Sequence, residues 1–227
     1  MVGIVFGGSA GYFSYYLGVS KYLIENYDLE NVKLAGVSGG SIAALGLCLG
    51  EKSYNSFVED VIRSGLNDMR EMNTFQNSIF KDGVVGPESV QLFKKKMTKT
   101  IQESHRFEKI GDRCTIIATR MDGLNAATDY INDWNSIHEL VDCVVASCWV
   151  PLIFGNVSTK FRGKNYIDGG IPFIFNSKKI YPTQQDDWIY VDLYTFHRFQ
   201  ENFFQSAINI GALLFTANKS FTDSLIQ

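Results

Sequence analysis

Ser38 stands in the run Gly36-Val37-Ser38-Gly39-Gly40, which matches the pattern G-x-S-x-G. Residues 33–37 before it, apolar after Lys33, predict a short strand, and residues 41–49 after it predict an apolar helix. In this context a tight turn lifts the serine hydroxyl away from the backbone, and Gly36 and Gly40 keep strand and helix from clashing. Unpaired N–H groups at a helix start also favour developing negative charge. The pattern indicates a nucleophilic serine, although a plain Gly/Ser-rich turn between a strand and a helix has similar residues.

The run Tyr166-Ile167-Asp168-Gly169-Gly170 places an acid at the end of another short predicted strand. In isolation, an aspartate before two glycines is usually a turn former. A serine nucleophile needs a base, however, and a carboxylate in a site of low dielectric has a raised proton affinity and can accept the proton. Asp168 is therefore the candidate base, followed by a turn that contains Gly169 and Gly170.

A second glycine-rich turn, Gly7-Gly8-Ser9-Ala10-Gly11, follows the first predicted strand at residues 2–6. Its small residues leave backbone N–H groups able to face a ligand, which suits either a phosphate cradle or an oxyanion hole. Neither G-x-G-x-x-G nor G-K-[ST] is present, so a dinucleotide site is disfavoured and a P-loop is excluded. An oxyanion hole would give this turn and the serine turn one shared purpose.

The other predicted elements extend the alternation of strands and helices, which is typical of a parallel sheet covered by helices. Further strands are predicted at residues 113–121, 126–131, 157–161, 165–167 and 188–196, with a hairpin around Arg162-Gly163. Helices are predicted at residues 14–26, 52–72, 87–105, 137–148 and 203–217, with a loop at 73–86. The 227 residues, 45% of them hydrophobic, suit one α/β domain.

Composition narrows the possible functions. A formal net charge of -3 argues against a nucleic-acid binder. The four cysteines form no C-x-x-C pair, and no calcium loop or cofactor motif is present, so we expect neither a metal nor a cofactor. Residues 1–20 carry no charge, but their five glycines and the lack of a basic start argue against a signal peptide or a membrane span. We therefore expect an intracellular protein, either cytoplasmic or peripherally associated with a membrane.

Taken in order, the motifs resemble those of the patatin-like phospholipase family. The glycine turn, the run Y-Y-L-G-V at residues 15–19, G-V-S-G-G and D-G-G follow one another as they do in that family. Residues 143–155, which end in W-V-P-L-x-x-G at 149–155, are similar to the family's segment before D-G-G. The resemblance covers residues 2–172 and is closest to the neutral-lipase branch, which includes adipose triglyceride lipase.

The resemblance implies a three-layer α/β/α sandwich with a mainly parallel central sheet. It also implies a serine lipid acyl hydrolase that cleaves carboxylic esters of phospholipids or acylglycerols through an acyl-enzyme on Ser38, with Asp168 as base and no histidine. The oxyanion hole would use the amides of Gly8, Ser9, Ala10 and Gly11. The substrate would be a lipid, at a membrane or lipid-droplet surface. Protein partners are not indicated.

The glycine turn departs from the family pattern. When the family's hexad is aligned with residues 8–13, Ala10 and Phe13 replace glycines and Tyr12 occupies the basic position. This departure predicts either an oxyanion hole of different shape or a low activity.

Two other functions fit parts of the sequence. One is an α/β-hydrolase with a Ser38–Asp168–His197 triad, whose chain order is right for that fold. Against it, Ser38 follows only the second predicted strand, whereas that fold builds several strands before its serine turn. The other is a catalytically silent lipid-binding or scaffold protein, which the altered glycine turn keeps open.

Residues 52–105 interrupt the alternation, so we expect a helical insertion within a single domain of residues 1–227. Phe75, Ile79 and Phe80 lie beside the predicted loop and suggest a mobile, substrate-facing segment that enters a lipid surface, with a plain packing insertion as the alternative. Four lysines on the helix at 87–105 suit anionic head groups, although such a run is more often a solvated helix face: Lys94, Lys95, Lys96 and Lys99.

Overall fold

The computed structural model describes residues 2–9, 13–65, 67–68, 86–123, 125–151, 153–174 and 187–192. Within these residues every predicted strand and helix is present, with ends shifted by at most a few residues. The predicted loop tip with Phe75, Ile79 and Phe80, the end of the last strand, His197 and the helix at 203–217 lie outside the described part of the chain.

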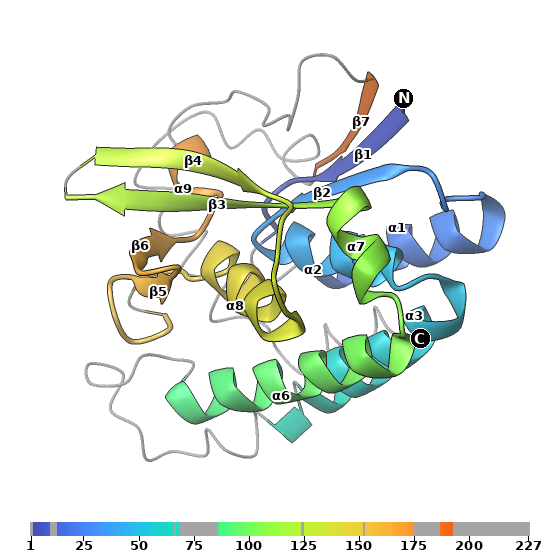
Figure 1. Cartoon of the computed structure of the whole chain (residues 1–227), viewed down its shortest axis with the longest axis horizontal. Coiled ribbons are helices and arrows are strands. Elements are labelled where there is room, and N and C mark those ends of the chain that lie inside the picture. The colour runs from blue at the N-terminus through green and yellow to red at the C-terminus, as the bar shows by residue number, and fades with distance from the viewer. Residues whose placement is uncertain are drawn as a thin grey trace.

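The described strands form one seven-stranded sheet (Figure 1). Its members are β1 (Val2–Phe6), β2 (Lys33–Val37), β3 (Cys114–Asp122), β4 (Asn125–Ile131), β5 (Thr159–Phe161), β6 (Lys164–Ile167) and β7 (Asp187–Val191). Strands β3, β2, β1 and β7 lie side by side in this order, and all their pairings are parallel. The pairs β3–β4, β3–β6 and β5–β6 are antiparallel. The sheet is thus mixed, with the predicted parallel strands at its centre.

Side chains of the central strands alternate between two buried faces. Ile4, Phe6 and Leu34 belong to the main core beneath the sheet. Val5, between Ile4 and Phe6, and Ala35, after Leu34, face the opposite side of the sheet. There they are equally buried, in a second cluster with Val37 and Ile117. A parallel sheet buried on both faces is typical of helices packed above and below it. The mixed sheet flanked by helices confirms the predicted three-layer α/β/α class.

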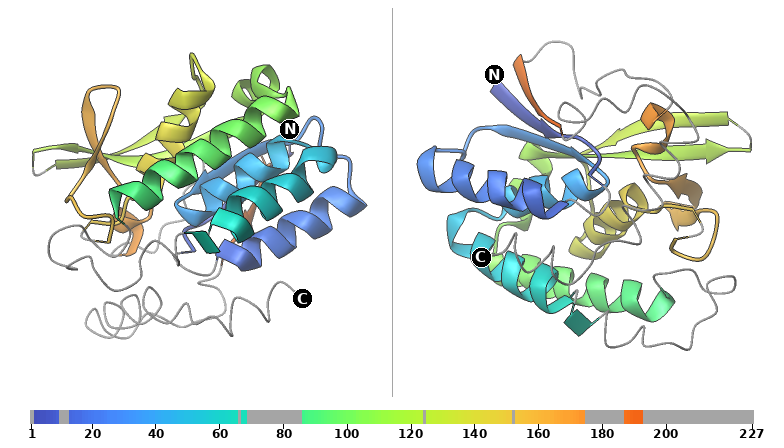
Figure 2. Two further views of the ribbon diagram at one scale, coloured as in Figure 1. Left: turned by 90° about the horizontal axis from the view of Figure 1, so that it is seen from below. Right: turned by 180° about the vertical axis from the view of Figure 1, so that it is seen from behind.

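The described helices of the main core lie on one side of the sheet (Figures 1 and 2). They are α1 (Phe13–Asn26), α2 (Gly39–Cys48), α3 (Glu51–Ser56), α7 (Phe107–Arg113) and α8 (Ile137–Ser147). Helix α2 packs directly against β1, β2 and β3, and α8 packs against β3. Helix α6 (Pro87–Ser104) lies farther from the sheet, against α8. Ser38 starts the helix closest to the sheet, and Ser147 ends the next one.

Strand β3 pairs with three strands, β2, β4 and β6, and these pairings determine where Ser38 and Asp168 lie. Strand β4 occupies one edge of β3 over Ile116–Asp122, so β2 and β6 must share the other edge. β2 runs parallel to β3 and ends with Val37 opposite Ile117, whereas β6 runs antiparallel and ends with Ile167 opposite Thr119. The two strands therefore approach each other head-on, and their ends are separated along β3 by two residues, about 7 Å. The next residues, Ser38 and Asp168, are brought together at this gap.

A polar cluster across three strands holds β6 in this register. Arg120 of β3 donates two hydrogen bonds of 2.9 Å to the carboxylate of Asp129 on β4. The hydroxyl of Tyr166 on β6 donates to the same carboxylate at 2.7 Å. Because a slip of one residue would move Tyr166 to the other face of the sheet, this cluster opposes any displacement of the neighbouring Asp168.

The described part of residues 52–105 is helical, as predicted. Helix α3 continues into a π-helix at Phe57–Arg63, and α6 packs across it. Three of the four lysines on α6 form ion pairs with carboxylates. The distance is 2.8 Å for both Lys94–Asp142 and Lys96–Asp68, and 3.7 Å for Lys99–Glu103, which are one helical turn apart. These pairs favour the solvated-face interpretation of the cluster. None of the helices in the described residues has the length and apolarity needed to cross a bilayer.

Two glycines allow β2, α2 and the glycine turn to approach one another. A Cβ on Gly36 would lie 2.3 Å from the carbonyl oxygen of Gly40, and a Cβ on Gly40 would lie 2.3 Å from that of Gly7. Both neighbours are backbone atoms and cannot rotate away. Gly18, in α1, is the contrasting position because a Cβ there would meet nothing within 4 Å.

We therefore expect Gly40→Ala to destabilise the protein by roughly 3 kcal/mol or more, through a backbone clash at the centre of the fold. Gly18→Ala is the matched control and should be stabilising by about 0.5–1 kcal/mol, as is usual for Gly to Ala inside a helix. Urea unfolding of both variants measures the difference. A Gly40→Ala protein as stable as the wild type would show that the close packing is not required.

Candidate active site

Ser38 occupies a strained turn between β2 and α2. Its backbone angles are φ 53° and ψ −130°, a region that residues with a side chain rarely adopt. The strain persists because β2 and α2 fix the residue from both sides through the contacts of Gly36 and Gly40. The turn directs the Ser38 hydroxyl out of the strand ladder and toward the end of β6.

The hydroxyl of Ser38 donates a hydrogen bond of 2.5 Å to Oδ2 of Asp168. The other carboxylate oxygen, Oδ1, accepts the backbone N–H of Gly170 at 2.7 Å. Both Ser38 and Asp168 are buried. The two predicted residues, 130 positions apart in the chain, thus form a direct pair in which each carboxylate oxygen has one donor.

Burial raises the pKa of Asp168 from its ordinary 3.8 to about 6, and the hydrogen bonds from Ser38 and Gly170 partly offset this effect. A carboxylate with this pKa is largely ionised at neutral pH yet binds a proton far more readily than an ordinary aspartate. It can therefore accept the proton of Ser38 as the hydroxyl attacks a carbonyl carbon, and return it later to a leaving group.

The glycine turn lies directly against the serine turn, as the close approach of Gly40 to the carbonyl of Gly7 shows. Gly8 is half-buried with open space where a side chain would be, and Ser9 is buried. Ala10 and Gly11 lie outside the described residues. On the other side of Ser38, the first two amides of α2, those of Gly39 and Gly40, have no acceptor within their own helix, whereas the N–H of Ser41 donates to the carbonyl of Ser38 at 2.8 Å. The glycine turn and the start of α2 therefore lie against each other beside Ser38.

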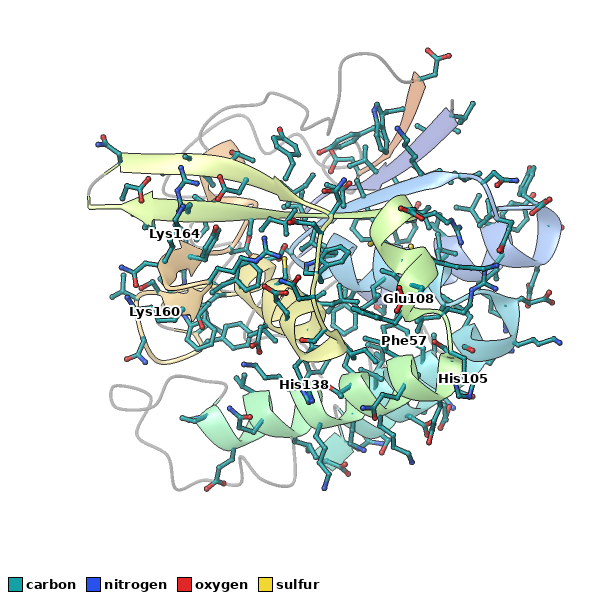
Figure 3. The ribbon with its side chains drawn as sticks, viewed as in Figure 1. Phe57, His105, Glu108, His138, Lys160 and Lys164 are labelled. Atoms are coloured by element: carbon teal, nitrogen blue, oxygen red, sulfur yellow. The ribbon has the colours of Figure 1, made fainter. Side chains whose placement is uncertain are left out.

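The structure describes two histidines, both labelled in Figure 3. His105 follows the last turn of α6, and His138 is in the first turn of α8. The opposite end of α8 contacts Ser38, and the helix of 11 residues is about 16 Å long. Neither histidine can orient Asp168 directly. His197 is outside the described residues, so the triad alternative is open.

Sequence reasoning missed Ser147, at the end of α8. Its hydroxyl accepts the backbone N–H of Ser38 at 2.9 Å and donates to the carbonyl of Ile117 at 2.7 Å. Two further hydrogen bonds tie this helix end to the aspartate turn, from Gly169 N–H to the carbonyl of Ser147 at 3.0 Å and from Asp168 N–H to that of Trp149 at 2.7 Å. The only signal was position, because the residue lies within residues 143–155, the stretch that resembles the family's segment before D-G-G.

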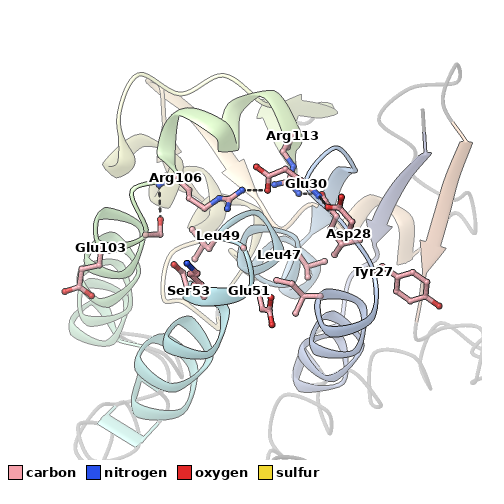
Figure 4. A pocket seen from close by; sticks show the side chains of 15 residues that line it. Tyr27, Asp28, Glu30, Leu47, Leu49, Glu51, Ser53, Glu103, Arg106 and Arg113 are labelled. Atoms are coloured by element: carbon pink, nitrogen blue, oxygen red, sulfur yellow. Dashed lines mark hydrogen bonds and ion pairs between the residues drawn. The ribbon is translucent and has the colours of Figure 1, made fainter.

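A cavity of about 630 Å³ opens at the far end of α2, lined by Leu47, Leu49 and Arg106 among others (Figure 4). Because Ser38 is at the start of α2, this cavity is separated from the Ser38–Asp168 pair by the length of that helix. Among its charged side chains, Arg106 forms an ion pair with Glu30. In the part of the chain that the structure describes, no three His, Cys, Asp or Glu side chains cluster closely enough to hold a metal ion.

Residues 4–175 match the family described as Patatin-like phospholipase. The chain belongs to the patatin-like phospholipase family. The matched region begins in β1 and includes the glycine turn, Ser38 and Asp168. Membership supports a lipid ester hydrolase and confirms the resemblance drawn from the motifs.

Curated relatives are similar over a shorter region. The chain is 38% identical over 63 residues to the 1-acylglycerol-3-phosphate O-acyltransferase Pnpla3 of Mus musculus, and 39% identical over 70 residues to PNPLA3 of Homo sapiens, which has the same description. These regions cover 27% and 29% of this chain and 14% and 13% of the relatives. The match thus spans about one seventh of each relative.

Two solved structures are similar at low identity. VipD from Legionella pneumophila has a TM-score of 0.48 and 15% identity over 84% of this chain and 49% of that chain. The ExoU–SpcU complex of Pseudomonas aeruginosa has a TM-score of 0.38 and 11% identity over 100% of this chain and 51% of that chain.

The raised pKa of Asp168 makes a prediction about stability. The folded carboxyl binds its proton up to about pH 6, whereas the unfolded one loses it near 3.8. The folded wild type must therefore lose stability as the pH rises from about 4 to 6, by up to about 3 kcal/mol. Asp168→Asn has no carboxyl to titrate at this position, so this pH-dependent loss of stability is absent from it. The stability of Asp168→Asn relative to the wild type should therefore increase from about pH 4 to 6.

Urea unfolding of both proteins at pH 4.5 and pH 7.5 measures this change. Asp112→Asn, which removes an exposed carboxyl from α7, is the control. A stability difference between Asp168→Asn and the wild type that is the same at both pH values would contradict the burial argument.

Proposed function

We propose that this protein is a serine lipid acyl hydrolase in which Ser38 is the nucleophile and Asp168 the base. The 2.5 Å hydrogen bond between Ser38 Oγ and a carboxylate with raised proton affinity carries the proposal. Membership of the patatin-like phospholipase family supports the substrate class, a carboxylic ester of a phospholipid or an acylglycerol.

The proposed reaction has two halves. In the first, Ser38 Oγ attacks the ester carbonyl carbon while Asp168 accepts the hydroxyl proton, and the resulting oxyanion is stabilised by the amides of Gly8, Ser9, Ala10 and Gly11. The tetrahedral intermediate then collapses, and the alcohol leaves with the proton from Asp168. In the second half, Asp168 takes a proton from water, which attacks the acyl-enzyme. The bond to Ser38 Oγ then breaks, the fatty acid leaves, and Asp168 returns the proton to Ser38 Oγ.

An acyl-enzyme can also be resolved by an alcohol in place of water. The curated relatives are described as 1-acylglycerol-3-phosphate O-acyltransferases. The acceptor to test is therefore the lysolipid 1-acylglycerol-3-phosphate. If it is added to the assay, acyl transfer would yield the doubly acylated lipid at the expense of free fatty acid. Unchanged fatty acid release would leave hydrolysis as the reaction.

Ester turnover should depend on Ser38. Ser38→Ala should lose turnover by roughly 10³-fold or more, because no nucleophile is left at the turn. Fatty acid release from mixed phospholipid and acylglycerol substrates measures the loss. Ser89→Ala removes another buried serine hydroxyl, on α6, and should keep wild-type turnover. Equal turnover by Ser38→Ala and the wild type would exclude the proposed nucleophile, and a folded wild type without turnover on any ester would favour a silent lipid-binding protein.

The absence of a histidine from the mechanism gives a separate prediction. His105→Ala, His138→Ala and His197→Ala should each retain most activity, while Asp168→Asn should lose nearly all of it. The rate should rise with pH along one limb near pH 6 as Asp168 ionises. A histidine base would give a limb at about pH 6.5. The two pH values are too close for the position of the limb to distinguish a histidine from Asp168. Carboxyl ionisation has a small enthalpy and imidazole ionisation a large one, so a limb that moves little between 10 and 35 °C supports Asp168. Loss of activity in folded His197→Ala would support the triad.

A further inference from the structure

The end of α8 contacts both halves of the proposed dyad. Ser147 is fully buried, its hydroxyl holds the N–H of Ser38, and its carbonyl holds the N–H of Gly169, the residue after Asp168. The same hydroxyl donates to Ile117 on β3. One residue thus connects the serine turn, the aspartate turn and the strand on which both depend.

These contacts occur where the sheet itself offers none. The ladder of β2 along β3 ends at the pair Val37–Ile117, and that of β6 ends at Ile167–Thr119. Beyond these pairs, none of the described strands pairs with Ser38 or Asp168. Ser147 supplies an acceptor for Ser38 in that gap and is itself anchored to the carbonyl of Ile117.

The hydrogen bonds of Ser147 are also unusual for a helical serine. A serine inside a helix commonly donates back to the carbonyl four residues earlier. The Ser147 hydroxyl instead donates to a residue 30 positions away and accepts from one 109 positions away. Replacement by alanine would leave two buried backbone groups, the N–H of Ser38 and the carbonyl of Ile117, without this partner.

The close approach of the aspartate turn strengthens the arrangement. A Cβ on Gly169 would lie 2.2 Å from the carbonyl oxygen of Ile117, the oxygen that accepts the Ser147 hydroxyl. The serine and aspartate turns therefore converge on Ile117, and Ser147 is hydrogen-bonded to each of them and to Ile117.

We propose that Ser147 is a positioning residue that sets the distance between the Ser38 hydroxyl and the Asp168 carboxylate, an inference that rests on the proposed function. It does not touch the reacting atoms. Without the Ser147 hydroxyl, the backbone amide of Ser38 should be able to move. The Ser38 hydroxyl would then no longer stay within hydrogen-bond reach of Asp168.

Three readouts should change together in Ser147→Ala. The value of kcat should fall by roughly 10- to 100-fold, as a displacement of about 1 Å does in other enzymes, while KM for a small ester stays the same. The pH limb should move upward, because the hydrogen bond from Ser38 is one of the contacts that lower the pKa of Asp168. The amide of Ser38 should exchange its hydrogen faster, since its acceptor is gone.

The experiment compares the wild type, Ser147→Ala, Ser147→Cys and Ser89→Ala in hydrolysis of p-nitrophenyl butyrate, with thermal melting of each. Ser147→Cys keeps a weak donor and acceptor and should have intermediate kcat and exchange. It also serves as the test variant if Ser147→Ala does not fold. Wild-type kcat, pH limb and exchange at Ser38 in a folded Ser147 variant would overturn the positioning role.

Ser38→Ala, measured alongside, separates the two claims. If Ser38→Ala is inactive and the folded Ser147 variants are fully active, the positioning role is wrong and the proposed function stands. If Ser38→Ala is as active as the wild type, the proposed function fails. Faster exchange of the Ser38 amide in Ser147→Ala would then still show that Ser147 holds the serine turn.

Discussion

The site depends on one constraint: β2 and β6 meet end to end along the same edge of β3. Because β4 occupies the opposite edge, β2 and β6 are confined to a single line and must stop two residues apart. Ser38 and Asp168 come directly after those ends, so their distance is set by backbone pairing more than by side-chain flexibility. The same convergence explains why Gly169 has no room for a side chain against Ile117, while Gly36 and Gly40 are crowded where β2, α2 and the glycine turn meet.

The site is also held in an unfavourable state that the surrounding fold must maintain. Ser38 keeps a positive φ that its side chain disfavours, and Asp168 is a carboxylate buried without a cation in contact among the described residues. Both features cost folding free energy and both are useful for acyl transfer, since they expose the nucleophile and raise the proton affinity of its base. The packed glycines and the polar cluster of Arg120, Asp129 and Tyr166 keep this arrangement from relaxing.

Local sequence patterns were sufficient to predict most elements and both members of the pair. Short, mostly apolar runs indicated β1 and β2, and glycines marked the turns after them. Arg162-Gly163 indicated a hairpin turn, in which both residues have positive φ. The antiparallel course of β6 and its place beyond the end of β2 were not predictable, because register depends on contacts between distant segments. The short helix α7 was not predicted, and Phe57–Arg63 was predicted as a helix without its π-helical geometry. Ser147 was missed because a serine near a helix end has no local signal that distinguishes it from an ordinary polar residue.

The most direct test of the Ser38–Asp168 pair is labelling of the intact, folded protein with a fluorophosphonate probe, followed by mass-spectrometric mapping of the modified residue. The probe reacts with a serine hydroxyl only when a base removes its proton. The account predicts modification at Ser38, at a rate that rises with pH along a limb near 6 and is nearly abolished in Asp168→Asn. Modification of another residue such as Ser41, or equal labelling of Ser38 in Asp168→Asn, would contradict it.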